Sequence, residues 1–344
     1  MKVLVTGGCG FLGSNLCLFY RAKGADVIAY DNLAKHEFSR NTYMKPEARS
    51  YNKEFLEKAG VTICVRDIRN KADLLQAAKG CDYICHTAAQ SAMTISWEDP
   101  ELDFSTNTLG TFNVLDVARQ LEIPVAVCSS IHTYGPERIN ASLSEKKTRY
   151  VRNPVAIGDD EPLLQGMVTP LHASKRSNEI YVQSYIDTFN LKAACFRLTG
   201  IYGLHQFGGE DHGWVANFLI RAIIGEELTI FGTGKQTRDI LFASDVTEAF
   251  DSFYQKQKPG IYTIGGGEKN MISLLESIEL IKDILAVKPV VKFENERRGD
   301  LRYFVADFSK FRDATGWEPQ VRPEEGIRRL SDWVKENAGL FYKK

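Results

Sequence analysis

The stretch TGGCGFLG at residues 6–13 decides the fold of this chain. It follows the short apolar run KVLV at residues 2–5 and opens a segment with helical periodicity, GSNLCLFYRAKG at residues 13–24. Glycines after a strand permit a tight turn and let the backbone approach a pyrophosphate, whose charge is favoured at the N-terminus of the next helix. The strand–turn–helix order therefore predicts a dinucleotide-binding turn made of Gly7, Gly10, Phe11, Leu12 and Gly13.

Short β-rich runs alternate with helical segments as far as residue 203. Strands that alternate with helices imply right-handed βαβ units and a parallel sheet with both faces covered. We therefore predict a doubly wound α/β fold, a Rossmann domain, over residues 1–203. The β-rich runs after the first are DVIAYDN at 26–32, VTICVRDI at 61–68, YICHTAA at 83–89, VAVCSS at 125–130 and KAACFRLTGIYG at 192–203.

The alternation loosens after residue 203. Residues 204–344 are predicted to form mainly a smaller α/β domain that binds the substrate, with segments that can return to the first domain. Within it, residues 228–250 are expected to form a hairpin-like stretch that leads into a helix. Residues 136–168 form a long, mostly irregular segment, and loops of this length in compact domains are usually functional or mobile.

The composition is that of a soluble globular protein. The chain has 344 residues, of which 44% are hydrophobic and 25% charged, with a formal net charge of -1. A near-neutral balance argues against nucleic acid as the main partner, and no apolar run approaches the roughly 20 residues that span a bilayer. Because no signal-peptide pattern precedes the glycine turn, we expect a cytoplasmic protein. The 7 cysteines have no zinc-binding spacing, so core thiols are expected and no metal site is predicted.

Polar or small residues stand where the next strands end. Asp31 closes the second strand, where its carboxylate can bind the adenosine ribose and repel a 2′-phosphate, which favours NAD over NADP. Asp67 ends the third strand, where it can meet the adenine edge or cap a helix. Small residues after the fourth strand allow a close approach of backbone to cofactor. The cofactor-binding residues predicted from these strand ends are Asp31, Asn32, Asp67, Ile68, Ala88, Ala89 and Gln90.

Motifs along nearly the whole chain resemble the extended short-chain dehydrogenase/reductases that act on nucleotide sugars. The matching stretches are TGGCGFLG, DNL, HTAAQ, NTLGT, SSIHTYG, SK, FRLTGIYG, GTGKQTRDILFASD and RRGDLRYFVAD. Within that family the chain is most similar to CDP-tyvelose (CDP-paratose) 2-epimerases, through AMTISWEDPELDF at 92–104, the insert before Lys175 and DHGWVANF at 211–218. The resemblance implies bound NAD and a nucleotide-diphosphate sugar, with a CDP-sugar favoured.

The resemblance assigns roles to residues that match the family's motifs. Ser130 matches the residue that hydrogen-bonds the reacting hydroxyl. Lys175 matches the lysine that binds the nicotinamide ribose and lowers the pKa of a neighbouring tyrosine through its charge. Arg238 and Arg297 match a clamp on the diphosphate, which arginine suits because its planar fork pairs two oxygens, although each could be an exposed ion-pair partner. Trp214 is placed in the same substrate site.

The family's catalytic tyrosine is missing. Its position, four before Lys175, holds Leu171, which cannot take a hydroxyl proton. His172 is adjacent, but one helical residue turns a side chain by about 100°, so it can substitute only if the helix begins later than expected. His132 lies on the loop after the fifth strand. Histidines titrate at about pH 6 to 7 unless perturbed, so either one, or water, is a candidate for the base.

Three functions therefore stay open. The first is 2-epimerisation, in which a sugar hydroxyl is transiently oxidised and the keto-sugar is reduced from its other face. The second is another oxidation of a nucleotide sugar, namely 4-epimerisation, dehydrogenation or decarboxylation; Ile131 and His132 replace the Asp-Glu of the family's dehydratases, which disfavours dehydration. The third is a non-catalytic NAD sensor, against which the retained Ser130, Lys175 and arginines weigh.

The resemblance also implies a homodimer. In this family two helices per subunit, including the one after the Ser-Lys pair, form a four-helix interface. Residues 176–190 supply Ile180, Tyr181, Ser184 and Tyr185 for such a face.

Overall fold

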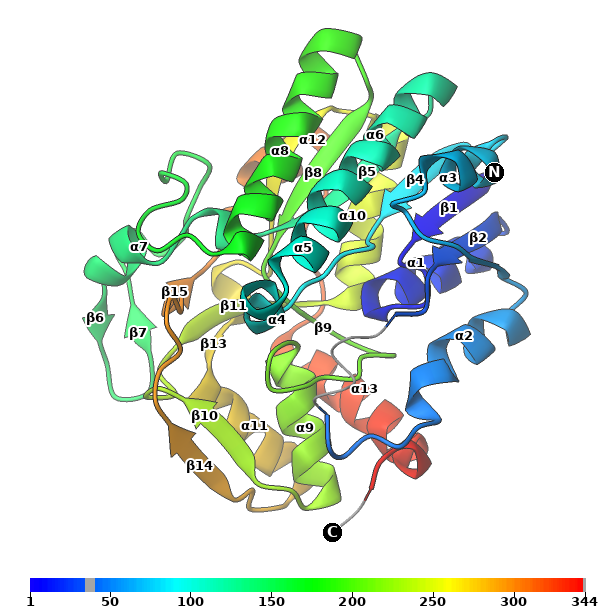
Figure 1. The fold of residues 1–344 in the computed structure, drawn as a ribbon. Coiled ribbons are helices and arrows are strands. Elements are labelled where there is room, and N and C mark those ends of the chain that lie inside the picture. Colours follow the sequence, from blue (N-terminus) through cyan, green and yellow to red (C-terminus); the bar gives the residue numbers. More distant parts are fainter. Residues whose placement is uncertain (35–40, 343–344) are drawn as a thin grey trace.

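The computed structural model of the chain describes residues 1–34 and 41–342, and its centre is a seven-stranded sheet (Figure 1). Every neighbouring pair of its strands is parallel, which confirms the predicted doubly wound α/β fold. From edge to edge the strands are β12 (Gly260–Ile264), β8 (Ala193–Leu198), β5 (Val125–Ser130), β4 (Tyr83–His86), β1 (Lys2–Thr6), β2 (Asp26–Asp31) and β3 (Thr62–Val65).

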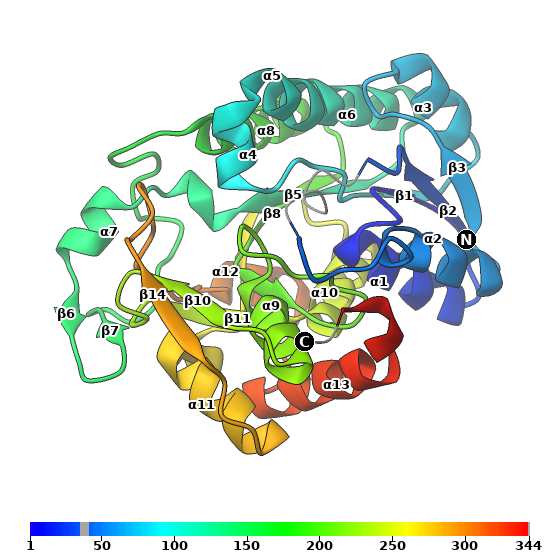
Figure 2. The same cartoon turned by 60° about the horizontal axis from the view of Figure 1, so that its bottom comes forward.

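Helices cover both faces of this sheet, as Figure 2 shows. In α1, Leu12, Leu16 and Tyr20 recur every four residues and are buried, because the helical period places them on one stripe. Since both faces are covered, all six residues of β8 are buried. One face packs against α1 (Phe11–Ala22), α10 (Ala243–Lys256) and α12 (Ser309–Thr315), and the other against α3 (Lys71–Ala78), α6 (Gly110–Leu121) and α8 (Pro170–Phe189).

A smaller unit with its own core continues from the end of β8. Its core includes Phe218, Ile240, Ile281 and Trp333. The strand β12 and the helix α10, which follow it in the sequence, belong instead to the large sheet and its covering layer. The elements of the smaller unit are β9 (Gly200–Tyr202), α9 (Trp214–Ile224), β10 (Leu228–Phe231), β11 (Thr237–Phe242), β13 (Met271–Ser273), α11 (Leu274–Leu285), β14 (Val291–Glu294), β15 (Tyr303–Phe304) and α13 (Pro323–Glu336).

The hairpin predicted for residues 228–250 is wrong. Strand β10 pairs with β14, and β11 pairs with β9, β13 and β15, so the two strands do not pair with each other. In the segment between the two strands, Gly232 and Gly234 adopt positive φ angles of 87° and 76°, and Gln236 Nε2 donates to Phe231 O across the turn. Because β11 is almost wholly buried, both of its edges need partners, and distant segments supply them.

Shorter elements connect these layers. The segment at residues 136–168 is mostly irregular and is anchored where Ile157 forms a β-bridge with Ala306. No described helix is both long and apolar enough to cross a membrane. None of the seven cysteines, all of which lie in the described residues, forms a disulfide, and five of them are buried. The connecting elements are α2 (Ala48–Lys58), α4 (Met93–Glu98), α5 (Pro100–Asp103), the π-helix η2 (Phe104–Leu109), the 3-10 helix η3 (Ile131–Thr133), α7 (Glu137–Ala141), β6 (Ser144–Glu145) and β7 (Tyr150–Val151).

Candidate active site

The glycine turn after β1 leaves no room for side chains. Gly7 has φ +66°, and a Cβ there would lie 2.7 Å from Ala88 Cα, while a Cβ at Gly13 would lie 2.0 Å from Gly7 O. Gly10 is the N-cap of α1 and supplies no side-chain cap, so Phe11 and Leu12 begin the helix with their N–H groups available to a ligand. A cradle of this shape at a helix N-terminus fits the pyrophosphate of a dinucleotide.

Asp31 lies beside this turn at the end of β2. Its carboxylate accepts hydrogen bonds from the N–H groups of Cys9 (2.9 Å) and Leu33 (2.7 Å). The neighbouring Asn32 donates through Nδ2 to Asp67 Oδ2 at 3.0 Å, so the ends of β2 and β3 meet.

Asp67 is held as an anion rather than as a helix cap. Hydrogen bonds from Arg69 lower the pKa of Asp67 to about 2. The helix-cap alternative is not observed, because Asn70 caps α3. Ile68, the next residue, is buried and packs against Gly110 of α6.

The residues after β4 divide between surface and interior. Ala88 is half-buried against the glycine turn and Ala89 is exposed. The Gln90 side chain is buried and turned inward, where Nε2 donates to Asp103 Oδ1 at 3.0 Å. Asn107 of η2 links this segment to α8, since its Nδ2 donates to Gln90 O and to Ser174 Oγ. These contacts brace the residue that precedes Lys175.

Lys175 lies in the interior with few partners. Only 5% of it is exposed, burial lowers its pKa, and its Nζ donates to Cys128 O over 3.4 Å. An ammonium has three protons to donate, so this one can also bind the hydroxyls of a ribose. Ser130 ends β5, the strand that carries Cys128, and its Oγ accepts a hydrogen bond from His132 N at 3.2 Å. The structure thus brings the predicted Ser130 and Lys175 to the same end of the sheet.

Leu171 and His172 lie in the first turn of α8, which begins at Pro170. Leu171 is only 1% exposed. His172 completes a capping box: its Nδ1 accepts from the N–H (3.3 Å) and from the hydroxyl (2.5 Å) of Thr169. Because the helix does not begin later than expected, the condition under which His172 could replace a tyrosine at position 171 is not met.

His132 faces His172 from the loop after β5. Their ring centroids are 5.4 Å apart in an edge-to-face arrangement. Burial, followed by the charges of His172, Arg238 and Lys175, lowers the pKa of His132 to about 3. Burial also lowers the pKa of His172. Burial therefore perturbs both histidines, so the titration at about pH 6 to 7 that is expected of an unperturbed histidine does not apply to them.

The two predicted clamp arginines lie at the smaller unit and have acidic neighbours. Arg238 on β11 has 13% of its side chain exposed, burial lowers its pKa, and its Nη2 lies 3.5 Å from Asp300 Oδ1. Arg297 Nη2 donates to Glu210 O at 2.9 Å and lies 3.3 Å from Asp211 Oδ1. Both arginines are thus ion-pair partners in this structure, and the charge of Arg238 also contributes to lowering the pKa of His132.

Trp214, the remaining predicted substrate residue, begins α9 and is half-buried. Its Nε1 lies 3.7 Å from where a Cβ of Gly200 would stand. Glycine at position 200 therefore leaves the indole close to the backbone of β9.

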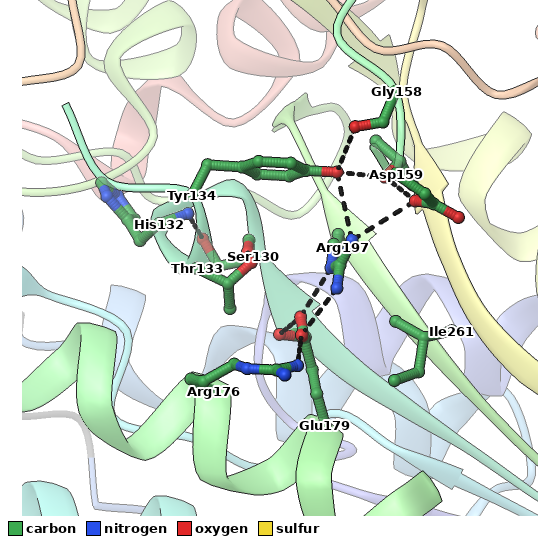
Figure 3. Close-up of polar contacts among 12 residues, drawn as sticks. Ser130, His132, Thr133, Tyr134, Gly158, Asp159, Arg176, Glu179, Arg197 and Ile261 are labelled. Carbon is green, nitrogen blue, oxygen red and sulfur yellow. Dashed lines mark hydrogen bonds and ion pairs between the residues drawn. The ribbon is translucent and has the colours of Figure 1, made fainter. Parts of the chain in front are cut away.

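A buried charge network that the sequence analysis missed lies beneath Ser130 (Figure 3). Glu179 accepts from Arg197 Nε and Nη2, both at 2.9 Å, and from Ser129 Oγ at 3.0 Å. Arg197 Nη1 donates to Tyr134 OH at 3.1 Å, and that hydroxyl donates to Gly158 O at 3.2 Å. The network joins α8, β8 and the segment after β5. The one signal in the sequence was an arginine inside the apolar run of β8.

A pocket of about 480 Å³ opens beside this network and away from the predicted site residues. Its charged lining is already paired: Arg176 with Glu179, and Lys310 with Asp159. Among the described residues, no group of three or more His, Cys, Asp or Glu side chains could hold a metal ion.

Comparison with known proteins agrees with this geometry. Residues 3–265 match the NAD dependent epimerase/dehydratase family. A CDP-paratose 2-epimerase of Salmonella typhi is 34% identical over 348 residues, which cover 97% of this chain and 99% of the relative. The structure of UDP-glucose 4-epimerase from Thermus thermophilus in complex with NAD has a TM-score of 0.78 at 30% identity, covering 97% and 99% of the two chains.

A second solved structure is similar to the same degree. UDP-glucose 4-epimerase from Thermotoga maritima with UDP-glucose has a TM-score of 0.80 at 26% identity and covers 98% of this chain and 100% of its own. The glycine cradle, Asp31 and the buried Lys175 fit a dinucleotide, and the match spans most of the chain. The protein belongs to the NAD dependent epimerase/dehydratase family and is an NAD-dependent enzyme.

Proposed function

We propose that this enzyme epimerises a nucleotide-diphosphate sugar by transient oxidation of a ring hydroxyl, with Leu171 at the position of the family's tyrosine. The observation that carries the proposal is that Ser130 and the buried Lys175 lie at the same end of the sheet as the glycine cradle. A pure NAD sensor would need the cradle and Asp31, but it would have no use for a serine at the reacting position.

Each residue has a part in this proposal. Gly7, Gly10, Gly13 and Asp31 hold the pyrophosphate and adenosine ribose of NAD, and Lys175 holds the nicotinamide ribose. Bound NAD supplies the acceptor for two electrons and returns them to the same carbon. Ser130 Oγ hydrogen-bonds the reacting hydroxyl, because it stands at the end of β5 on the side of Lys175.

The diphosphate would lie against the smaller unit. Arg238 and Asp300 form only a long ion pair, and burial raises the pKa of Asp300 as it lowers that of Arg238. A bound diphosphate would give Arg238 a closer anion. Arg297 is half-exposed and can contribute from the edge, with Trp214 and Gly200 lining the sugar's end.

A CDP-sugar and its 2-position are the favoured substrate and reacting carbon. This choice rests on the full-length similarity to the CDP-paratose 2-epimerase of Salmonella typhi. Oxidation at another carbon, as in the UDP-glucose 4-epimerases that the chain also resembles, is the alternative.

We also propose a homodimer through α6 and α8. These helices pack side by side, and Ile180, Tyr181 and Phe189 of α8 are exposed at 53%, 40% and 47%. Tyr185, which the sequence analysis placed on this face, is instead buried against Phe112, because it points between the two helices. A monomer in light scattering at micromolar concentration would contradict the dimer.

The test has two stages. Mass spectrometry of small molecules released from denatured protein should find NAD or NADH, and NADP as the main dinucleotide would contradict the cofactor assignment. The protein is then given CDP-paratose or UDP-glucose carrying deuterium on the carbon to be inverted. Epimerisation that retains the deuterium without exchange with water supports the proposal. Bound NAD with no conversion or reduction by either sugar would favour a sensor.

A further inference from the structure

We propose that His132 takes the proton of the reacting hydroxyl through Nε2, and that His172 is a positioning residue beside it. The inference rests on the proposed oxidation of a sugar hydroxyl and assigns the base that Leu171 cannot provide.

His132 lies next to Ser130 and to the start of α8. The 3-10 turn that carries His132 follows Ser130 directly, and His132 N donates to Ser130 Oγ. Its ring contacts that of His172, the residue after Leu171. The imidazole therefore lies beside the serine and against the first turn of α8, the turn that also carries Leu171.

The ring nitrogens of His172 and His132 differ in their hydrogen bonds. His172 Nδ1 accepts hydrogen bonds from both the N–H and the hydroxyl of Thr169, so neutral His172 carries its proton on Nε2 and has no lone pair to offer. The ring of His132 makes no hydrogen bond to any residue that the structure describes, and its Nδ1 is enclosed. With the proton on the enclosed Nδ1, the Nε2 lone pair of His132 stays free to face a substrate.

Tyr134, the tyrosine on the same segment as His132, cannot take the role. The Tyr134 hydroxyl is engaged by Arg197, Gly158 and Thr263, and burial raises its pKa. Figure 3 shows the side chains of Tyr134 and His132 pointing in opposite directions from their shared segment.

The surroundings of His132 keep it in the neutral form, which is the form that can accept a proton. Burial, followed by the charges of His172, Arg238 and Lys175, lowers its pKa, which also weakens it as a base. A diphosphate bound at Arg238 would offset part of this positive field and raise the basicity of the imidazole when substrate is present. In the forward step the O–H proton moves to Nε2 and the C=O bond forms, while the C–H hydrogen leaves with its electron pair to the dinucleotide. The reverse step returns both to the sugar.

The test compares His132→Gly with His172→Gln, using CDP-paratose as the probe. Loss of a general base lowers the rate by about 100- to 10,000-fold, so His132→Gly should lose that much while its NAD affinity by calorimetry stays unchanged. Added imidazole should restore a large part of the rate, which loss of a merely structural residue would not allow. His172→Gln should lower the rate by less than His132→Gly does, and added imidazole should not restore it, because His172 orients the base and takes no proton itself. Glu325→Gln, in the exposed pair of α13 with Arg329, is the control that should keep the wild-type rate.

A second readout does not depend on turnover. Nitrogen-15 NMR of the histidines, assigned with the same variants, should show the Nδ1–H form of His132 and the Nε2–H form of His172. An Nε2–H form of His132 would overturn the proposal, as would imidazole rescue of His172→Gln alone. If the wild type turns over the sugar and His132→Gly keeps the full rate, the role of His132 is overturned, while the proposed epimerase activity is not. A wild-type protein that oxidises no nucleotide sugar overturns both.

Discussion

Glutamine in place of Glu179 would break the buried charge network beneath Ser130. Glu179 is fully buried and accepts four hydrogen bonds, two from Arg197 and one each from Arg176 and Ser129. Arg197 is itself only 5% exposed, and its other carboxylate, Asp159, lies farther away at 3.3 Å. The substitution therefore leaves a buried guanidinium without its main counter-charge.

The expected cost is about 3 kcal/mol in the free energy of unfolding, at the low end of the roughly 3–5 kcal/mol lost when one partner of a buried pair is removed. The low end applies because a glutamine oxygen can still accept from Arg197 and because Asp159 supplies part of the missing charge. Urea unfolding at one fixed protein concentration measures this, since an oligomer's stability depends on concentration.

Two variants sharpen the measurement. Glu179→Leu with Arg197→Met removes both charges and keeps the volume, so it should be more stable than Glu179→Gln. Glu325→Gln, in the exposed pair of α13 with Arg329, should change little, because surface ion pairs contribute little. If Glu179→Gln unfolds within 1 kcal/mol of the wild type, taken as roughly the limit for a surface pair, the reasoning that this network holds α8 to β5 and β8 is refuted.

Three further outcomes are expected. Asp31→Ala should weaken NAD binding in calorimetry by about 1.5–3 kcal/mol, roughly 10- to 150-fold, because it removes charge-assisted hydrogen bonds; unchanged affinity would contradict the ribose assignment. Leu171→Tyr should speed reduction of bound NAD by the sugar, at a cost of about 1–3 kcal/mol for overpacking a buried site, and a folded but inert variant would show that the sugar binds differently. Burial raises the pKa of Asp239 from 3.8 to about 7, so the folded protein keeps a proton that the unfolded chain has lost. The contribution of protonated Asp239 to the free energy of unfolding is complete below about pH 4 and is lost as the pH rises through 7, by up to about 4 kcal/mol. Thermal melts of Asp239→Asn should lack this fall in stability.

Local patterns in the sequence were enough for the framework and for the cofactor site. Alternating strands and helices predicted the parallel sheet, and glycines with an acidic residue at the next strand end predicted NAD, because turn, cap and period preferences act over a few neighbouring residues. The start of α8 could be read from Thr169-Pro170 for the same reason, and with it the divergence of His172 from the face of Leu171 and Lys175.

Only the tertiary structure decided which distant segments meet. The sequence predicted a hairpin over the stretch that holds β10 and β11, but strand partners are chosen across the whole chain, so that prediction was wrong. In the sequence, Glu179 and Arg197 are two separate charged residues, and only the packing of α8 against β8 shows that they pair. His132 and His172 became distinguishable in the same way. The His172 ring accepts hydrogen bonds at its own helix end, whereas the His132 ring has no hydrogen-bond partner among the described residues. This difference depends on how the segment after β5 packs against α8 and not on either stretch of sequence.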